Sequence, residues 1–121
     1  MDYMFQKCYN LRTLDLSNFN TIKVRRMKYM FENCKSLTSL DLTNFNTQNV
    51  NTMEKMFYYA DALKTLDVSS FYVDDNTDIE NMFAYATYHT TQGIVKINSN
   101  FYEYIKPVRY SLYSYIRFAV E

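Results

Sequence analysis

The chain repeats itself every 26 residues, and this periodicity limits the possible folds more than any other feature of the sequence. Residues 4–29 and residues 30–55 share 13 identities in 26 aligned positions, without a gap. The pair Met-Phe recurs at positions 4, 30, 56 and 82. A fixed period of about 20–50 residues is typical of solenoid proteins, in which stacked units bury a core that no single unit can bury alone. We therefore expect a single repeat domain.

Each unit contains a pattern that predicts a short β-strand. In the stretch "LTSLDLTNF" (residues 37–45), Leu40 and Leu42 alternate with polar residues, and Leu37 precedes them. Alternation of this kind is typical of a strand with one buried face. We expect the leucines to face the core and four polar residues of this unit to face solvent: Thr38, Ser39, Asp41 and Thr43.

A second pattern in each unit predicts a helix after the strand. Thr47 is a candidate N-cap, because a threonine hydroxyl can accept from an orphan N–H of the first helical turn. Apolar residues then follow at the spacing of one helix face: Val50, Met53, Met56, Phe57 and Ala60. The predicted fold class is thus α/β, a short leucine-rich-repeat-like solenoid with parallel strands on one face and helices on the other.

The period also predicts where the repeats stop. We expect a solenoid over residues 1–101, with units 4–29, 30–55, 56–81 and a degenerate unit 82–101, and a capping segment over 102–121. Val95, Ile97 and Phe101 match the inward columns, which predicts a last strand there. The tail after Pro107 fits a helix face but also alternates like a strand. We favour the helix, and its tyrosines suit either a cap or a contact surface.

The first unit gives an expectation about association. The stretch "MDYMF" aligns with "MKYMF" of the next unit, and no polar capping segment precedes the strand predicted at residues 11–16. Uncovered apolar ends and strand edges promote association. We therefore expect an open N-terminal end, as in a piece of a longer array, and self-association through it.

The composition argues against several classes of function. The 13 basic and 13 acidic residues give zero formal net charge, whereas general nucleic-acid or anionic-membrane binders are basic. Gly93 is the only glycine, which is too few for a phosphate-binding loop. No apolar run is long enough to span a bilayer, and the N-terminus lacks the pattern of a signal peptide. These features leave the localisation open.

The unit M-F-x-x-C-x-x-L-x-x-L-D-L-S-N-F-N-T-x-x-V-x-x-M resembles the repeat of BspA-like leucine-rich-repeat surface proteins. Leu11, Leu14 and Leu16 match the strand positions of that family, and the likeness covers about residues 1–86. The resemblance implies a non-enzymatic module at the cell surface or secreted, used for adhesion or ligand contact. Phenylalanine replaces the family's usual turn asparagine at positions 19, 45 and 71, so we expect the neighbouring asparagines 18, 20, 44 and 46 to bond the turn amides.

Three residue types are candidates for metal or redox chemistry, and we expect all three to be structural, with no cofactor. Cys8 and Cys34 share a column with Ala60 and Ala86, which indicates a small buried side chain. A disulfide needs Cα atoms within about 7 Å, whereas packed helices lie about 8–10 Å apart, so free thiols are predicted. The Met-x-x-Met pairs could bind copper(I) but fit a core stripe better. His89, the only histidine, is interpreted as a solvated loop residue without a partner.

The outward strand residues are the best candidates for a binding site, because repetition aligns them in ladders on one face. The candidate binding face consists of Arg12, Thr13, Asp15, Thr38, Ser39, Asp41, Lys64, Thr65 and Asp67. We expect this face to bind a protein or a glycan, and we expect no nucleic acid as partner and no membrane insertion.

The aspartate column permits other interpretations. Adjacent strands lie about 4.8 Å apart, so Asp15, Asp41 and Asp67 would repel one another. Hydrogen bonds to neighbouring hydroxyls, a bound cation, or Lys96 heading the fourth strand in this column would relieve that repulsion. The spacing also matches the carboxylates of retaining glycosidases, although a repeat produces it without a cleft. A structural remnant of a longer array, with no binding of its own, is the alternative function.

Overall fold

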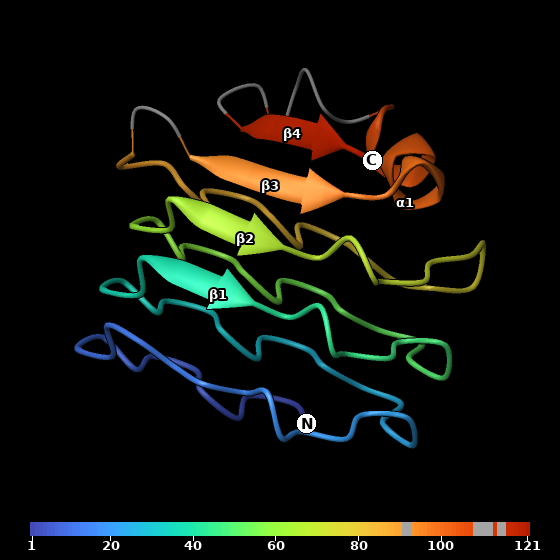
Figure 1. The fold of residues 1–121 in the computed structure, drawn as a ribbon, viewed down its shortest axis with the longest axis horizontal. Helices are drawn as coiled ribbons and strands as arrows, with labels where there is room; N and C mark the ends of the chain where they lie inside the picture. Colours follow the sequence, from blue (N-terminus) through green and yellow to red (C-terminus); the bar gives the residue numbers. More distant parts are fainter. Residues whose placement is uncertain (91–92, 108–112, 114–115) are drawn as a thin grey trace.

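The computed structural model describes residues 1–90, 93–107, 113 and 116–121. It is a small α/β fold with a four-stranded parallel sheet and, in the described residues, one short helix (Figure 1). The elements are β1 (Ser39–Asp41), β2 (Thr65–Asp67), β3 (Ile94–Ile97), α1 (Ser99–Ile105) and β4 (Arg117–Val120). The strands lie in the order β1-β2-β3-β4, so each strand pairs with the next one along the chain.

The strand register follows the predicted columns. Leu40 of β1 is paired with Leu66 of β2, and Leu66 with Val95 of β3. All three side chains are buried, while Ser39 and Asp41 on either side of Leu40 are exposed. The predictions of parallel strands and of inward leucines are therefore confirmed for β1 to β3.

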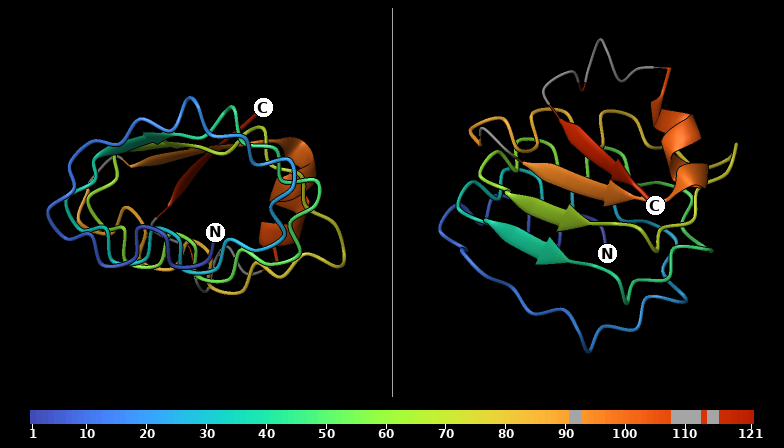
Figure 2. Two further views of the ribbon diagram at one scale, coloured as in Figure 1. Left: turned by 90° about the horizontal axis from the view of Figure 1, so that it is seen from below. Right: turned by 45° about the horizontal axis from the view of Figure 1, so that its top comes forward.

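The opposite wall is not helical, which corrects the prediction of a helix after each strand. Residues 47–60 form turns, and the backbone N–H groups of Met27, Tyr29 and Phe31 donate to the carbonyls of Thr52, Glu54 and Met56 in the next unit, at 2.8–3.0 Å. We call this hydrogen-bonded layer, residues 1–7, 27–33, 53–59 and 79–85, the second wall. Figure 2 shows the successive units nearly superposed, with the sheet on one side of the outline and the second wall on the other.

Left-handed backbone conformations explain why a helix cannot form in the second wall. Positive φ angles recur four residues apart in each unit, at 56° and 58° for Tyr29 and Asn33 and at 52° and 56° for Lys55 and Tyr59. A residue in this region interrupts an α-helix. The backbone groups are paired between units instead of within a helix, and apolar side chains that matched a helix face, such as Met53, Met56 and Phe57, are buried between the two walls.

Thr47 has a different role from the predicted N-cap. Its hydroxyl donates to the carbonyl of Tyr72 at 3.0 Å and accepts from the N–H of the same residue at 2.8 Å. Thr21 makes the same pair of bonds to Asn46, at 3.0 and 2.8 Å. Both threonines are buried. The column therefore joins one unit to the next and caps no helix.

Stacked phenylalanines fill the space between the two walls. Phe31 stacks on Phe5, Phe57 on Phe31 and Phe83 on Phe57, with ring centroids 5.5, 5.6 and 5.7 Å apart. The methionine columns line the same core, because five of the seven methionines are at most 1% exposed: Met27, Met30, Met53, Met56 and Met82. The interpretation of these residues as a core stripe is confirmed, whereas Met4 is 47% exposed.

The C-terminal region departs from the repeat. Asn98 caps α1, since its side chain accepts from the N–H of Phe101 at 2.8 Å. Phe101 stacks on Phe71 at 6.5 Å, as its column predicts. The favoured helix in the tail is wrong for residues 117–120, which form β4 and pair in parallel with β3. The remainder of that prediction, residues 108–112 and 114–115, lies outside the described residues.

The first unit lacks the strand predicted at residues 11–16. Leu16 is buried, but this segment has no assigned strand, and β1 is the first strand along the chain. The second wall joins this unit to the next, since Phe5 N–H donates to the Met30 carbonyl at 2.9 Å and Lys7 N–H to the Glu32 carbonyl at 2.8 Å. Side-chain bonds of Thr21 and Asn44 add to this attachment.

Candidate binding face of the sheet

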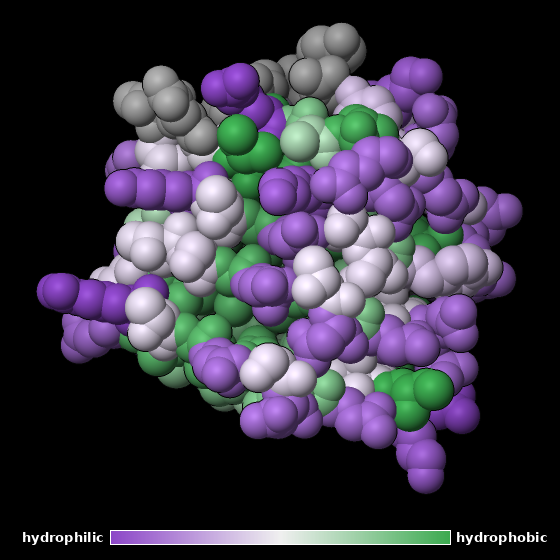
Figure 3. Space-filling model, viewed as in Figure 1, coloured by the Kyte–Doolittle hydropathy of each residue, from purple (hydrophilic) through white to green (hydrophobic). Residues whose placement is uncertain are grey.

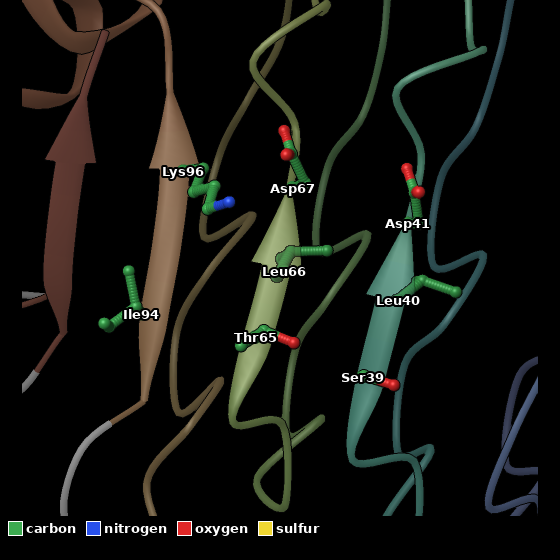
Figure 4. A pocket seen from close by; sticks show the side chains of 8 residues that line it. All are labelled: Ser39, Leu40, Asp41, Thr65, Leu66, Asp67, Ile94 and Lys96. Atoms are coloured by element: carbon green, nitrogen blue, oxygen red, sulfur yellow. The ribbon is translucent and has the colours of Figure 1, made fainter.

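A shallow pocket of about 300 Å³ lies on the outward side of the sheet and spans β1, β2 and β3 (Figure 4). Its lining residues are Ser39, Leu40, Asp41, Thr65, Leu66, Asp67, Ile94 and Lys96. Figure 3 shows hydrophobic surface exposed between hydrophilic residues in the region of β1 and β2. We call this feature the sheet pocket. It offers carboxylates, hydroxyls, an ammonium group and apolar surface together.

The aspartates beside the sheet pocket shape the turns that follow the strands. Asp41 Oδ1 accepts from the N–H of Thr43 at 2.9 Å and from its hydroxyl at 2.7 Å. Asp67 Oδ1 accepts from the N–H and hydroxyl of Ser69 at 3.0 and 2.6 Å. Asp15 Oδ1 accepts from the N–H of Ser17 at 2.9 Å. Hydrogen bonds to neighbouring residues, one of the expected means of relief, therefore stabilise all three carboxylates.

Lys96 completes the row, as the column predicted. The register aligns Asp41 with Asp67, and Asp67 with Lys96. Figure 4 shows the Lys96 side chain extending from β3 toward β2. The backbone N–H and the hydroxyl of Thr43 hold the pKa of Asp41 below its usual value, and the Lys96 ammonium adds to this effect. The hydroxyl and N–H of Ser17 likewise lower the pKa of Asp15. Both carboxylates are thus charged at neutral pH.

The predicted face is divided between several places. Ser39, Asp41, Thr65 and Asp67 line the sheet pocket. Asp15 borders a separate hollow of about 150 Å³ next to Asp41 and Thr43. The other predicted members are exposed but line neither hollow: Arg12, Thr13, Thr38 and Lys64.

Ile94 was not among the predicted residues of this face. It lies on β3 in register with Thr65 and lines the sheet pocket. Alignment of "GIVKIN" with the leucine columns carries the signal for it, since Ile94 then falls in the column of Ser39 and Thr65. An apolar side chain in an otherwise hydroxyl-bearing column makes this end of the pocket chemically different from the β1 end.

The asparagines near the strand ends bond turns in two ways. Asn20 and Asn46 accept from the N–H groups of Ile22 and Gln48 at 3.2 and 3.0 Å, which confirms the expected bonds to turn amides. Asn44 instead donates to three carbonyls of the preceding unit, at 3.0–3.2 Å. The Asn44 bonds lie beside the smaller hollow, which Leu16, Ser17 and Asn44 line.

His89 has a partner that the sequence analysis did not identify. Its Nε2 lies 3.4 Å from Oδ2 of Asp61, and its N–H donates to the Asp61 carbonyl at 2.9 Å. The imidazole is exposed, as expected, whereas Asp61 is buried. The pair lies at the end of the second wall and not in the sheet pocket.

Both cysteines are free thiols, as predicted. Cys34 is buried, and its burial together with the neighbouring Cys8 raises the pKa of its thiol to about 12. The helices about 8–10 Å apart that this prediction assumed are absent from these two units, however. The second wall brings the two units to hydrogen-bonding distance instead.

The described residues hold no group of three or more histidine, cysteine, aspartate or glutamate side chains that could bind a metal ion. Within residues 1–90, 93–107 and 116–121, no helix has the length and apolar character that crossing a membrane requires.

The parallel sheet, the 26-residue contacts and the polar face together define a small repeat protein with one regular strand face. The chain belongs to the family described as "Mycoplasma protein of unknown function, DUF285", whose family model matches residues 1–102. No curated protein and no solved structure matches the chain.

Proposed function

We propose that this chain is a non-enzymatic recognition module, a short leucine-rich-repeat-like solenoid that binds a protein or a glycan through its strand face. The observation that carries the proposal is the sheet pocket, in which charged, hydroxyl and apolar groups from three neighbouring strands converge. A parallel sheet holds these groups at the spacing of its strands, so little conformational entropy is lost when a ligand binds.

The chemistry of the sheet pocket suits a partner with both donors and acceptors. The turn bonds engage Oδ1 of Asp41 and of Asp67, so Oδ2 of each carboxylate can accept from a ligand hydroxyl or N–H. Lys96 supplies a cationic donor on β3, in register with Asp67. The volume of the sheet pocket, about 300 Å³, is at the small end of the range for ligand sites, which suits one sugar ring or one protein side chain.

The BspA-like resemblance supports the same proposal and adds a location. The unit M-F-x-x-C-x-x-L-x-x-L-D-L is the shared feature. On this basis we propose that the module belongs to a surface or adhesion protein.

A binding screen tests the proposal. The chain would be probed on a glycan array and used as bait in pull-downs, together with Asp41→Lys and Lys96→Glu, which reverse charges on two sides of the sheet pocket. Thr38→Arg is the matched control, because Thr38 is exposed and directly precedes β1 but does not line the pocket. Thermal melts would establish that all variants fold. Binding that survives both charge reversals, or that Thr38→Arg removes equally, would contradict the proposal.

A structural role is the alternative function, and the turn bonds favour it. Each aspartate of the column is used by its own turn, so the column has a function in folding whether or not a ligand binds. A chain that binds nothing on the array or in pull-downs, while Asp41→Asn destabilises it, would favour a structural segment of a longer repeat array.

A further inference from the structure

Cys8 and Cys34 occupy equivalent positions in neighbouring units, and the backbone beside them is hydrogen bonded from unit to unit. Phe5 and Lys7, just before Cys8, donate their N–H groups to the carbonyls of Met30 and Glu32 at 2.9 and 2.8 Å. Phe5 and Phe31, each three residues before one of the cysteines, stack with ring centroids 5.5 Å apart, which indicates the spacing of the two units here. Disulfides form between Cα atoms about 4.4–6.8 Å apart, so this spacing suits a bridge between the units.

The thiol of Cys34 is directed at the neighbouring unit. Its Sγ lies 3.1 Å from the carbonyl oxygen of Phe5, and the same oxygen accepts from the N–H of Cys8 at 3.2 Å. The sulfur of Cys34 and the backbone of Cys8 therefore meet at one atom.

We propose that Cys8 and Cys34 form a reversible thiol–disulfide pair that links the first unit to the second across the second wall. In the structure both residues are reduced. The oxidant is a low-molecular-weight disulfide, and oxidation ties together two units that are otherwise joined by hydrogen bonds and packing.

The order of reaction follows from accessibility. Cys8 is half-buried and Cys34 is buried, so Cys8 reacts first. Its thiolate attacks one sulfur of the small disulfide, forms a mixed disulfide and releases one thiolate. The sulfur of Cys34 then gives up its proton, attacks the Cys8 sulfur and releases the second thiolate. The two protons from the protein thiols end on the two small thiols, so one protein disulfide forms as one small disulfide is reduced.

Burial affects only the second step. It raises the pKa of the Cys34 thiol to about 12, so this thiol is protonated at neutral pH and reacts slowly with a small disulfide in solution. Within the folded chain the mixed disulfide on Cys8 is held beside it, and proximity compensates for the low thiolate fraction. The reaction is thus selective for the intramolecular bridge.

The test uses the full chain in glutathione buffers of graded oxidised-to-reduced ratio, followed by alkylation and mass spectrometry without reductant. The expected product is a monomer that has lost two hydrogen atoms and takes up no alkylating agent, with the two cysteine peptides linked. The equilibrium constant for the bridge should be at least about tenfold larger in the folded protein than in concentrated urea, because folding holds the thiols together. Glutathione adducts alone, dimers between chains, or an equal constant in urea would overturn the proposal.

Alanine variants supply the controls, and the repeat itself indicates that they fold, since Ala60 and Ala86 fill the same column in later units. Cys34→Ala should stop at a glutathione adduct on Cys8, and Cys8→Ala should react more slowly than wild type. The double variant Cys8→Ala, Ala60→Cys moves the pair one unit along the second wall. It should form a bridge between residues 34 and 60, and its failure to do so under the same buffers would contradict the spacing argument.

Discussion

The replacement Thr47→Val tests how the units are joined. Valine has nearly the shape of threonine but lacks the hydroxyl that donates to the Tyr72 carbonyl and accepts from the Tyr72 N–H, at 3.0 and 2.8 Å. Thr47 is 1% exposed, so water cannot replace the hydroxyl without a structural change. Each lost hydrogen bond costs about 1 kcal/mol, and more where a buried partner is left unpaired. We expect the free energy of unfolding to fall by about 2–4 kcal/mol.

Urea denaturation followed by far-ultraviolet circular dichroism would measure this change. Thr47→Ser, which keeps the hydroxyl, should retain most of the stability. Thr38→Val makes the same substitution at the exposed position just before β1 and should change the free energy of unfolding by less than about 0.5 kcal/mol. A change for Thr47→Val as small as that for Thr38→Val would refute the proposed role of the buried hydroxyl.

Three further predictions follow from the core, the thiol and the first unit. Leu40→Ala should lower the free energy of unfolding by about 2–5 kcal/mol because Leu40 is buried in β1. Thr38→Ala should lower it by no more than about 0.5 kcal/mol. Equal losses in urea titrations would mean that the buried and exposed residues are assigned wrongly. Burial raises the pKa of Cys34 from 9.0 to about 12, so the folded state holds this proton more tightly. The resulting stability is complete below about pH 9 and is lost toward pH 12, by up to about 1.4 kcal/mol per pH unit, and Cys34→Ala should lack this part of the pH dependence in parallel urea titrations. Finally, light scattering after size exclusion should detect self-association, since Met4 on the first unit is 47% exposed; a monomer at high micromolar concentration would contradict that prediction.

The sequence was sufficient to predict β1 to β3 and their pairing, but it predicted a helix where β4 forms and a strand at residues 11–16 that the structure lacks. Leu40 and Leu66 alternate with polar residues, and Val95 lies in their column despite the change in sequence around it. Because strand pairing depends on which face is buried, the alternation also gave the register, and the register placed Lys96 beside Asp67.

The second wall could not be predicted in the same way. Its φ angles are positive at tyrosine, lysine and asparagine residues such as Tyr29, Lys55 and Asn81. Glycine is the residue that usually marks such positions, and this chain has none there. The buried side chains of Val50, Met53 and Met56 have the spacing of one helix face, although the backbone N–H of Met53 donates to the next unit and not within a helix. The pattern of apolar residues therefore could not distinguish the second wall from a helix.

The candidate face was only partly predictable. The column positions of Ser39, Asp41, Thr65 and Asp67 follow from the repeat, and all four line the sheet pocket. The hollow itself depends on how neighbouring strands and their turns are arranged in space, which a one-dimensional pattern does not contain. The contact of His89 with Asp61 was missed for the same reason, since it depends on how the segment after the third unit folds back.

The threonine bonds and the backbone bonds of the second wall share one offset between units, which affects how such a gene can change in length. Thr21 bonds to Asn46 and Thr47 to Tyr72, each 25 residues later, and the backbone bonds of the second wall repeat the same step. A duplicated 26-residue segment inserted in frame between two units would meet on both sides the same partners that its parent meets. Unequal recombination can therefore lengthen or shorten the chain by whole units while each junction keeps the same pairs of hydrogen-bonding residues. Each added unit widens the strand face by one row of side chains.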